Sequence, residues 1–451
     1  MNWQETIDFF LLRSANVRFV VLGAVLIGAS AAVVGCFLFL RKRALVGDAI
    51  AHSVLPGVCL AFIFFQSKHP AILLAGAIVT GWISLLLINW ITNHSKIKSD
   101  TAIGLTLSWF FGIGILLLTA IQKTGNASQS GLDKFLFGKA SSLVRDDVIL
   151  FAIVSFCLIV TVMVFFTPLK LITFDRDFAI SKGVKVGLYE FLLSTLTVVA
   201  VATGIQAVGV VLMAALLITP AAAARFWTND LKKMVILAGF FGALSGLLGS
   251  FVSYNIPKMP TGPWIVVVVS TIAIFSFFVG SKKGLLNRFI KQRRISRKIL
   301  SENLLKLFYK LGEEEQNFRA LRTKDEIVNR RFFIPRELQI GLNVLERKDF
   351  LHQDNESFQL TDEGLEEGRR VTRLHRLWEM YLNQYLKIAP DHVHDDAEAI
   401  EHIITPEIEA ELLELMEHPE KDPHDTVIPY SNSELRIEFR MVDENCKKGE
   451  N

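Results

Sequence analysis

The chain has 451 residues, of which 51% are hydrophobic and 21% are charged, and its formal net charge is only +3. Apolar runs of eighteen or more residues exceed what a buried core helix needs, so the composition excludes a purely water-soluble protein. These runs dominate up to about residue 280, and the chain from Ser281 onward is charged and amphipathic. Three of the four cysteines lie in apolar segments and none forms a CxxC pair, which favours small buried side chains over a thiolate site.

Nine apolar segments are predicted to cross the membrane as helices, since about 20 residues span ~30 Å of hydrocarbon. The second is interrupted by Pro56-Gly57, and the sixth and seventh almost meet at residues 204–206. The N-terminus lacks the pattern of a cleaved signal peptide, so we expect the first segment to stay in the membrane. The predicted spans are Val17–Leu40, Ala49–Phe65, Pro70–Ile91, Ala102–Ile121, Val148–Phe166, Tyr189–Thr203, Ala207–Ala224, Met234–Tyr254 and Pro263–Val279.

Lysine and arginine gather in alternate loops and in the dense basic stretch 281–298 after the last span. The intervening loops are poorer, except for 122–147, where four basic residues are offset by three aspartates. Because cytoplasmic loops are the richer ones in lysine and arginine, we expect the N-terminus outside and the C-terminal part in the cytoplasm. An odd number of spans fits this orientation.

Asp48 and His52 lie where the second span begins. Being four residues apart, they project from one helical face, and ionisable groups there are costly unless they are paired or face a water-filled path. A carboxylate and an imidazole that converge on one point suit Mn²⁺, Fe²⁺ or Zn²⁺. The spacing alone equally allows Asp48 to cap the helix and His52 to be a satisfied buried histidine. Pro56-Gly57 either frees backbone carbonyls beside this path or is a packing kink.

Four motifs in order give the first 280 residues a family likeness. They are LVGDAIAHSVLPGV (45–58), SDTAIGLTLSWFFGIGILLL (99–118), FDRDFAISKGV (174–184) and QAVGVVLMAALLITPAAAA (206–224). Over roughly residues 17–280 the chain resembles the manganese/zinc/iron permease family of ABC transporters.

The resemblance implies a bacterial plasma-membrane permease that pairs with itself or a paralogue, a separate cytoplasmic ATPase and an extracytoplasmic metal-binding protein. It also implies that Asp48 and His52 contact the metal ion along the transport pathway. It also makes the loop with Phe174, Asp175, Ala179 and Gly183 the element that docks on the ATPase. The residues agree on one point: the chain has no G-x-x-x-x-G-K-[ST], so we expect another polypeptide to bind and hydrolyse ATP.

The residues after the membrane part predict a winged helix-turn-helix. The basic stretch 282–298 can meet anionic lipid headgroups or simply anchor the last span. An amphipathic helix over 301–315, the segment KDEIVNRR, a helix over 334–351 and a ribbon over 352–364 then follow. A winged helix can bind either DNA or protein. The side chains that could face a DNA groove are Arg336, Gln339, Asn343 and Arg347.

Carboxylates and imidazoles recur at helical spacing farther on. His375 and Glu379 are four apart, Glu398, Glu401 and His402 follow the i, i+3, i+4 pattern, and His394 lies one turn earlier. Without a thiolate, such a face fits Mn²⁺ or Fe²⁺; the alternative is a solvated acidic helix with incidental histidines.

LHRLWE, the E-x-x-E-H of 398–402 and HPEKDPHDTVIP (418–429) make residues 300–430 resemble the diphtheria-toxin-repressor and manganese-regulator family. The resemblance implies a dimerising metal-sensing domain with two metal sites. His375, Glu379 and His394 belong to one site, and Glu398, Glu401 and His402 belong to the second. Two first-helix positions depart from the pattern. Asn303 can still offer an oxygen, whereas the Lys306 ammonium is no ligand and repels a cation. This departure argues against metal-dependent DNA binding.

The sequence thus predicts an all-α polytopic membrane protein followed by a winged helix and a helical domain. The leading hypothesis is a metal-importer permease, for manganese first and zinc or iron as alternatives, whose cytoplasmic domain senses imported metal and adjusts transport. The other hypotheses are a membrane-anchored transcription regulator and a tail that only dimerises. The predicted parts are the permease domain (1–280), a basic linker (281–299), the winged helix (300–364), a metal-binding and dimerisation domain (365–430) and a tail (431–451).

Overall fold

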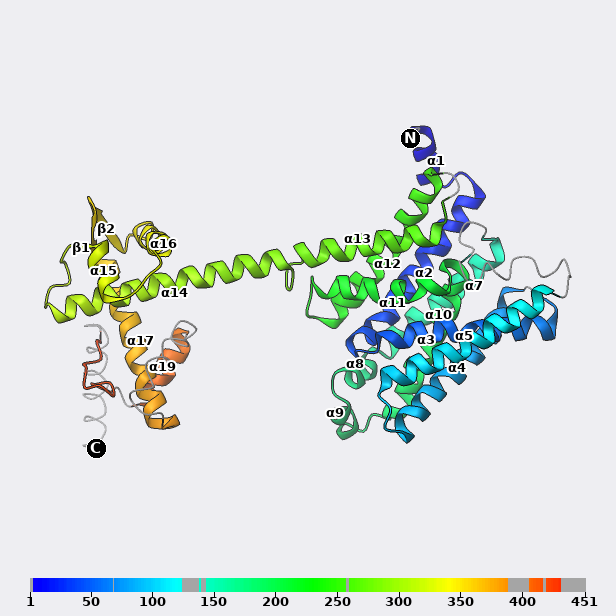
Figure 1. Ribbon diagram of the computed structural model, residues 1–451, viewed down its shortest axis with the longest axis horizontal. Helices are drawn as coiled ribbons and strands as arrows, with labels where there is room; N and C mark the ends of the chain where they lie inside the picture. Colours follow the sequence, from blue (N-terminus) through cyan, green and yellow to red (C-terminus); the bar gives the residue numbers. More distant parts are fainter. Residues whose placement is uncertain are drawn as a thin grey trace, which may run out of the picture. The chain divides into compact units, whose positions relative to one another are not determined.

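The structure is a computed structural model that describes residues 3–67, 69–123, 138, 143–256, 259–387, 405–416 and 419–430. It divides into two compact units, Met1–Arg288 and Phe289–Asn451. Figure 1 gives the order of their helices and strands.

The first unit is entirely helical in its described part. Eight of its helices are long and apolar enough to cross a membrane: α2 (Ala15–Leu40), α3 (Ala44–Phe65), α4 (Pro70–His94), α5 (Ser99–Lys123), α7 (Arg145–Val164), α10 (Val186–Val208), α12 (Leu231–Asn255) and α13 (Thr261–Val279). The others are α1 (Trp3–Phe10), α8 (Phe166–Phe174), α9 (Arg176–Ser181) and α11 (Val210–Arg225). The predicted all-α polytopic fold is confirmed, and the count of nine spans is approximate because α11 is short.

The boundary between α10 and α11 lies farther along the chain than predicted. Gly209 separates the helices with φ 94°, a backbone conformation that only glycine adopts readily. Gly204, near the predicted break, lies inside α10 instead. A Cβ there would come within 2.2 Å of the Met213 sulfur, so this glycine allows close packing of the two helices.

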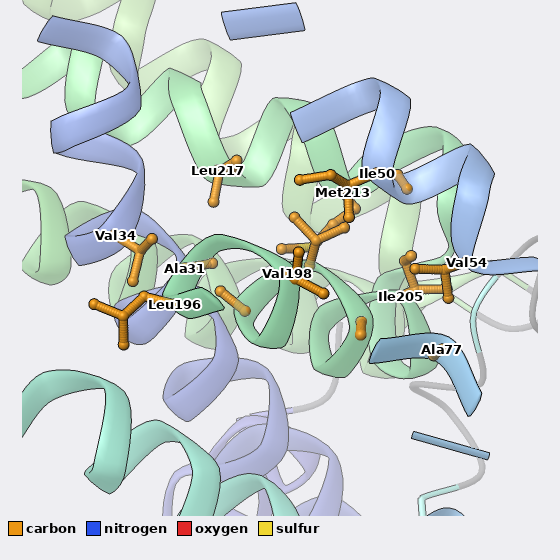
Figure 2. Packing of buried hydrophobic residues seen from close by; sticks show 14 of the residues in the cluster. Ala31, Val34, Ile50, Val54, Ala77, Leu196, Val198, Ile205, Met213 and Leu217 are labelled. Carbon is orange, nitrogen blue, oxygen red and sulfur yellow. The ribbon is translucent and has the colours of Figure 1, made fainter. Parts of the chain in front are cut away.

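The short helix α11 lies inside the bundle. It packs against α2, α3, α12 and α13, and Met213, Leu216 and Leu217 are completely buried. Figure 2 shows side chains of α2, α3, α4, α10 and α11 meeting in one apolar core, with Met213 and Leu217 of α11 among them. With 16 residues the helix is only about 24 Å long. Its neighbours cover it, so it does not need to span the full hydrocarbon thickness by itself.

Glycines set the distance between the principal helix pairs. A Cβ on Gly28 of α2 would lie 2.3 Å from the carbonyl oxygen of Gly242 on α12, and the reverse distance is 2.1 Å. Gly57 of α3 makes the same kind of approach to Gly76 of α4. Helix α3 runs without a break through Pro56. This geometry supports the packing interpretation of Pro56-Gly57.

The second unit begins with a winged helix, as predicted. Its elements are α14 (Leu285–Glu314, whose first turn belongs to the first unit), β1 (Arg322–Thr323), α15 (Lys324–Arg330), α16 (Pro335–Glu346), β2 (Leu351–Asp354) and β3 (Ser357–Leu360). The strands are antiparallel in the order β1-β3-β2. Helices α14 and α16 pack on this sheet through Leu304, Phe308, Leu342 and Phe358. The predicted helix 334–351 ends earlier, at Glu346, because Asp349 turns the chain with φ 57°.

Two further helices complete the described part of this unit. They are α17 (Asp362–Leu386) and α19 (Pro406–Leu415). Thr361 and Thr405 cap their N-termini by accepting hydrogen bonds from the backbone N–H groups of Gly364 and Ile408. Leu377 of α17 packs on Leu412 and Met416, and Ile428 closes this small core.

The close approach of α2 and α12 predicts that Gly28→Ala destabilises the first unit by about 1–3 kcal/mol, because the new methyl group meets the Gly242 carbonyl. Gly112→Ala in α5 is the matched control, since a Cβ there meets no atom within 4 Å in the described part of the chain. Thermal unfolding of the purified chain in detergent would separate the two variants. Equal midpoints would show that the helices can move apart at no cost.

Candidate functional site

Asp48 and His52 face one another on α3. The His52 Nε2 atom lies 3.6 Å from the Asp48 Oδ1 atom, and the side chains are 18% and 37% exposed. The edge of the imidazole meets the ring of Phe111 on α5, with centroids 4.9 Å apart and planes at 86°. Asp48 is not the N-cap of its helix, because Arg43 holds that position. The capping alternative for Asp48 is therefore wrong.

The second ring nitrogen of His52 is the unusual atom of this pair. Nδ1 is buried and has no hydrogen-bond partner among the described residues. Buried polar atoms without a partner are rare, because each costs the free energy of its lost hydration. Among the described residues, His52 therefore does not have the full set of partners that the satisfied buried histidine of the alternative interpretation would have.

Within the described residues, no group of three or more histidine, cysteine or acidic side chains gathers at one point. Asp48 and His52 are a pair of potential donors at this point. A divalent transition metal takes at least four ligands, so a metal ion here would need ligands beyond this pair.

The predicted docking loop comprises the end of α8 and the short helix α9. Asp175 caps α9, since its Oδ1 atom accepts a hydrogen bond from the Phe178 N–H at 2.9 Å. Ala179 is completely buried, and Gly183 turns the chain with φ 74°. These three residues shape the loop, whereas Phe174 is an exposed apolar side chain.

Two further exposed apolar side chains of this loop, Phe178 and Ile180, were not among the predicted docking residues. In the sequence Phe-Ala-Ile follows the charged run Asp-Arg-Asp in DRDFAISK, and this order by itself does not tell which apolar side chains are exposed. Phe174, Phe178 and Ile180 are thus three exposed apolar side chains of this loop, and we call this set of residues the docking patch.

Glu190 of α10 connects this loop to the helix bundle. Its carboxylate lies 2.8 Å from the Arg41 guanidinium at the end of α2 and 3.9 Å from that of Arg176 in α9. Arg41 also lines a cavity of about 90 Å³ whose mixed lining includes Arg43, Asn89 and Leu85. Glu190 was not among the predicted site residues, although an acidic residue at the start of a predicted span is a signal for function.

In the second unit, His375 and Glu379 of α17 form a buried pair. The His375 Nε2 atom lies 3.0 Å from the Glu379 Oε1 atom. The Lys306 Nζ atom of α14 lies 3.4 Å from the other ring nitrogen, Nδ1. Asn303, one turn before Lys306, is also buried, and its Oδ1 atom has no hydrogen-bond partner among the described residues. The other predicted metal residues, His394, Glu398, Glu401 and His402, lie outside the described residues.

Two arginines beside His375 fasten α17 to its neighbours. Arg373 binds Glu409 of α19 at 2.7 Å, with both side chains buried. Arg376 binds the Glu313 carboxylate of α14 at 2.5 and 3.1 Å. The first pair is buried and the second is half-buried, and neither was foreseen, because the partners are 36 and 63 residues apart in sequence.

Helix α16 carries the predicted DNA-contact residues. Arg336, Asn343 and Arg347 are exposed, whereas Gln339 is half-buried and donates a hydrogen bond to the Asn343 side-chain oxygen at 2.7 Å. The two amides thus satisfy one another in part, which leaves the arginines as the more available groups.

The long apolar helices and the appended winged helix define a polytopic membrane permease with a regulator-like domain. Residues 14–280 match the ABC 3 transport family, so the chain belongs to that family. Residues 361–430 match the iron dependent repressor, metal binding and dimerisation domain.

Several relatives share this organisation wholly or in part. The manganese transport system membrane protein MntC of Bacillus subtilis is 41% identical over 379 residues, 84% of this chain and 86% of that protein. The zinc transport system membrane protein TroC of Treponema pallidum is 43% identical over 277 residues, 61% of this chain and 93% of that protein. The solved structure of PsaBC from Streptococcus pneumoniae in complex with Fab matches with a TM-score of 0.56 and 34% identity, covering 64% of this chain and 99% of that one.

The buried pair of Arg373 and Glu409 predicts that Glu409→Gln strongly destabilises the second unit, by about 3–5 kcal/mol, because it leaves a buried guanidinium without its charge partner. Glu366→Gln is the matched control, since the Glu366 carboxylate pairs with Arg369 of the same helix at the surface and is worth about 0–1 kcal/mol. Thermal unfolding of the full chain would measure both. A loss for Glu409→Gln no larger than that of the control would contradict the assignment.

Proposed function

We propose that the chain is the membrane-spanning subunit of an ATP-driven importer for a divalent transition metal. Manganese is the first candidate, and zinc and iron are the alternatives. The observation that carries the proposal is the Asp48–His52 pair inside an apolar helix, with the His52 Nδ1 atom buried and unpaired among the described residues. The names of the manganese and zinc transport relatives support the same cargo.

The pair suits a cargo ion because it replaces part of the ion's hydration shell. A carboxylate oxygen supplies negative charge, and an imidazole nitrogen supplies a donor that Mn²⁺, Fe²⁺ and Zn²⁺ all accept. Two donors are too few for a stable site, and Asp48 remains partly exposed at the edge of its helix. A second permease copy or a paralogue that presents the same pair across an interface would complete the ligand set.

The proposed orientation follows from the basic loops and places the N-terminus outside and the C-terminal unit in the cytoplasm. Asp48 then lies about 6 Å from the cytoplasmic start of α3, four residues into the helix. The docking patch lies on the same side, where a separate ATPase would bind it. An extracytoplasmic metal-binding protein would deliver the ion from the opposite side.

The second unit is proposed to act as a sensor that adjusts transport to the imported metal. Its resemblance to a metal binding and dimerisation domain supports this role. The exposed Arg336 and Arg347 of α16 favour a second candidate, a membrane-anchored DNA-binding regulator. Footprinting with the full chain in nanodiscs, with and without Mn²⁺, separates the two, because only the regulator protects a specific DNA sequence.

We expect Asp48→Asn and His52→Gln each to lower metal uptake at least about tenfold, since each removes one ligand of the ion. Uptake of manganese, zinc and iron into proteoliposomes that contain the ATPase is the measurement. Asp100→Asn is the control, because this aspartate lies exposed in the first turn of α5. Intact uptake of all three metals by a folded double variant would refute the proposed path.

We expect Phe178→Ser and Ile180→Ser together to weaken co-purification of the ATPase, because they remove apolar area from the docking patch. Phe64→Ser is the control; Phe64 is also an exposed phenylalanine, near the opposite end of α3 from the Arg43 loop. An unchanged yield of the complex from the double variant would assign the docking contact to another part of the chain.

A further inference from the structure

The side chains of Lys306, His375 and Glu379 meet between α14 and α17. We propose that Lys306 is a built-in cation that takes the place of a metal ion at the His375–Glu379 pair. This pair then binds no divalent ion, and α14 stays attached to α17 whether or not metal is present. The inference deepens the proposed sensor function and rests on it for its regulatory meaning.

The Lys306 side chain occupies the space beside His375 in which a metal ion would have to lie. His375 and Glu379 are four residues apart on α17, and their side chains are 1% and 3% exposed. Lys306 enters from α14 and is itself 3% exposed. The imidazole therefore lies between an ammonium at 3.4 Å from Nδ1 and a carboxylate at 3.0 Å from Nε2.

Both ring nitrogens of His375 are engaged by protein groups, so neither is left to bind a metal ion. An ammonium only donates hydrogen bonds, so Nδ1 accepts from Lys306 and the Nε2–H group donates to Glu379; this tautomer is assigned from the partners. A metal-bound imidazole must direct one unprotonated nitrogen at the ion. Here that nitrogen is directed at Lys306.

The charges lead to the same conclusion. The Lys306 ammonium lies at Nδ1 and the Glu379 carboxylate at Nε2 of the same buried imidazole, so the cation at this ring is part of the chain and cannot diffuse away. A divalent ion at Nδ1 would lie beside this ammonium and be repelled by it. The flanking Arg373 and Arg376 are cations too, already paired with Glu409 and Glu313. Arg376 also lies 3.7 Å from the buried Asp422 carboxylate. Both arginine charges are thus balanced by carboxylates, and the charge that repels a divalent ion is that of the Lys306 ammonium, which contacts His375.

The consequence concerns how the second unit can respond to metal. The contact between α14 and α17 needs no ion, so a metal response must arise at other residues. The predicted set Glu398, Glu401 and His402 is the remaining candidate in the sequence. The two predicted metal sites would then have different roles, one a fixed structural joint and one a sensor.

The experiment counts Mn²⁺ ions bound per purified full chain in detergent by equilibrium dialysis. We expect wild type and His375→Gln to bind the same number. We expect Lys306→Glu, which exchanges the cation for a ligand, to bind one ion more. The combination of Lys306→Glu with His375→Gln should lose that extra ion. Lys306→Met should lower the thermal midpoint, because it removes the ammonium that donates to the buried His375 Nδ1 atom.

Loss of a bound ion from the wild-type count on His375→Gln would overturn the proposal. So would a folded Lys306→Glu chain, checked by gel filtration and thermal unfolding, that binds no extra ion. If Lys306→Glu does not fold, the comparison of wild type with His375→Gln decides alone. Metal uptake by wild type is measured separately, because its absence would refute the importer and leave the ion count untouched.

Discussion

The free-energy cost of removing a charged or polar group from water is the constraint on which both units depend. In α3 it explains why a carboxylate and an imidazole stand together, and it is the reason that His52 Nδ1, without a partner among the described residues, enters the proposed metal path. In α17 it explains why the buried Arg373 guanidinium has the Glu409 carboxylate at hydrogen-bond distance. Both units still hold buried polar atoms without a hydrogen-bond partner among the described residues, His52 Nδ1 in the first unit and Asn303 Oδ1 in the second among them.

Helix packing provides the frame that holds these groups. The backbones of α2 and α12, and of α3 and α4, touch through paired glycines, which fixes their spacing within narrow limits. The central α11 has no need of full length because α2, α3, α12 and α13 surround it. A polar pair on α3 is therefore presented by a scaffold with little freedom to close around it or move away.

The sequence was sufficient for features that depend on local composition. The length of the apolar runs predicted the membrane helices, and the short segment 352–364 predicted the wing, because each signal lies within one segment. Features that depend on distant residues were missed. The exposure of Phe178 depends on how α9 folds back, and the Arg41–Glu190 ion pair joins residues 149 positions apart. Lys306 was recognised as an obstacle to metal binding, but its place against the His375 Nδ1 atom could not be read from spacing.

Glu190 has two arginine partners that belong to different elements and lie at unequal distances. Arg41 ends a helix of the bundle, whereas Arg176 begins the short helix that carries part of the docking patch. The two guanidiniums approach different oxygens of this carboxylate, Oε1 for Arg41 and Oε2 for Arg176, so one side chain can hold both. Glu190 therefore links the position of α9 to Arg41 and to the cavity that Arg41 lines, without involving the length of any membrane helix.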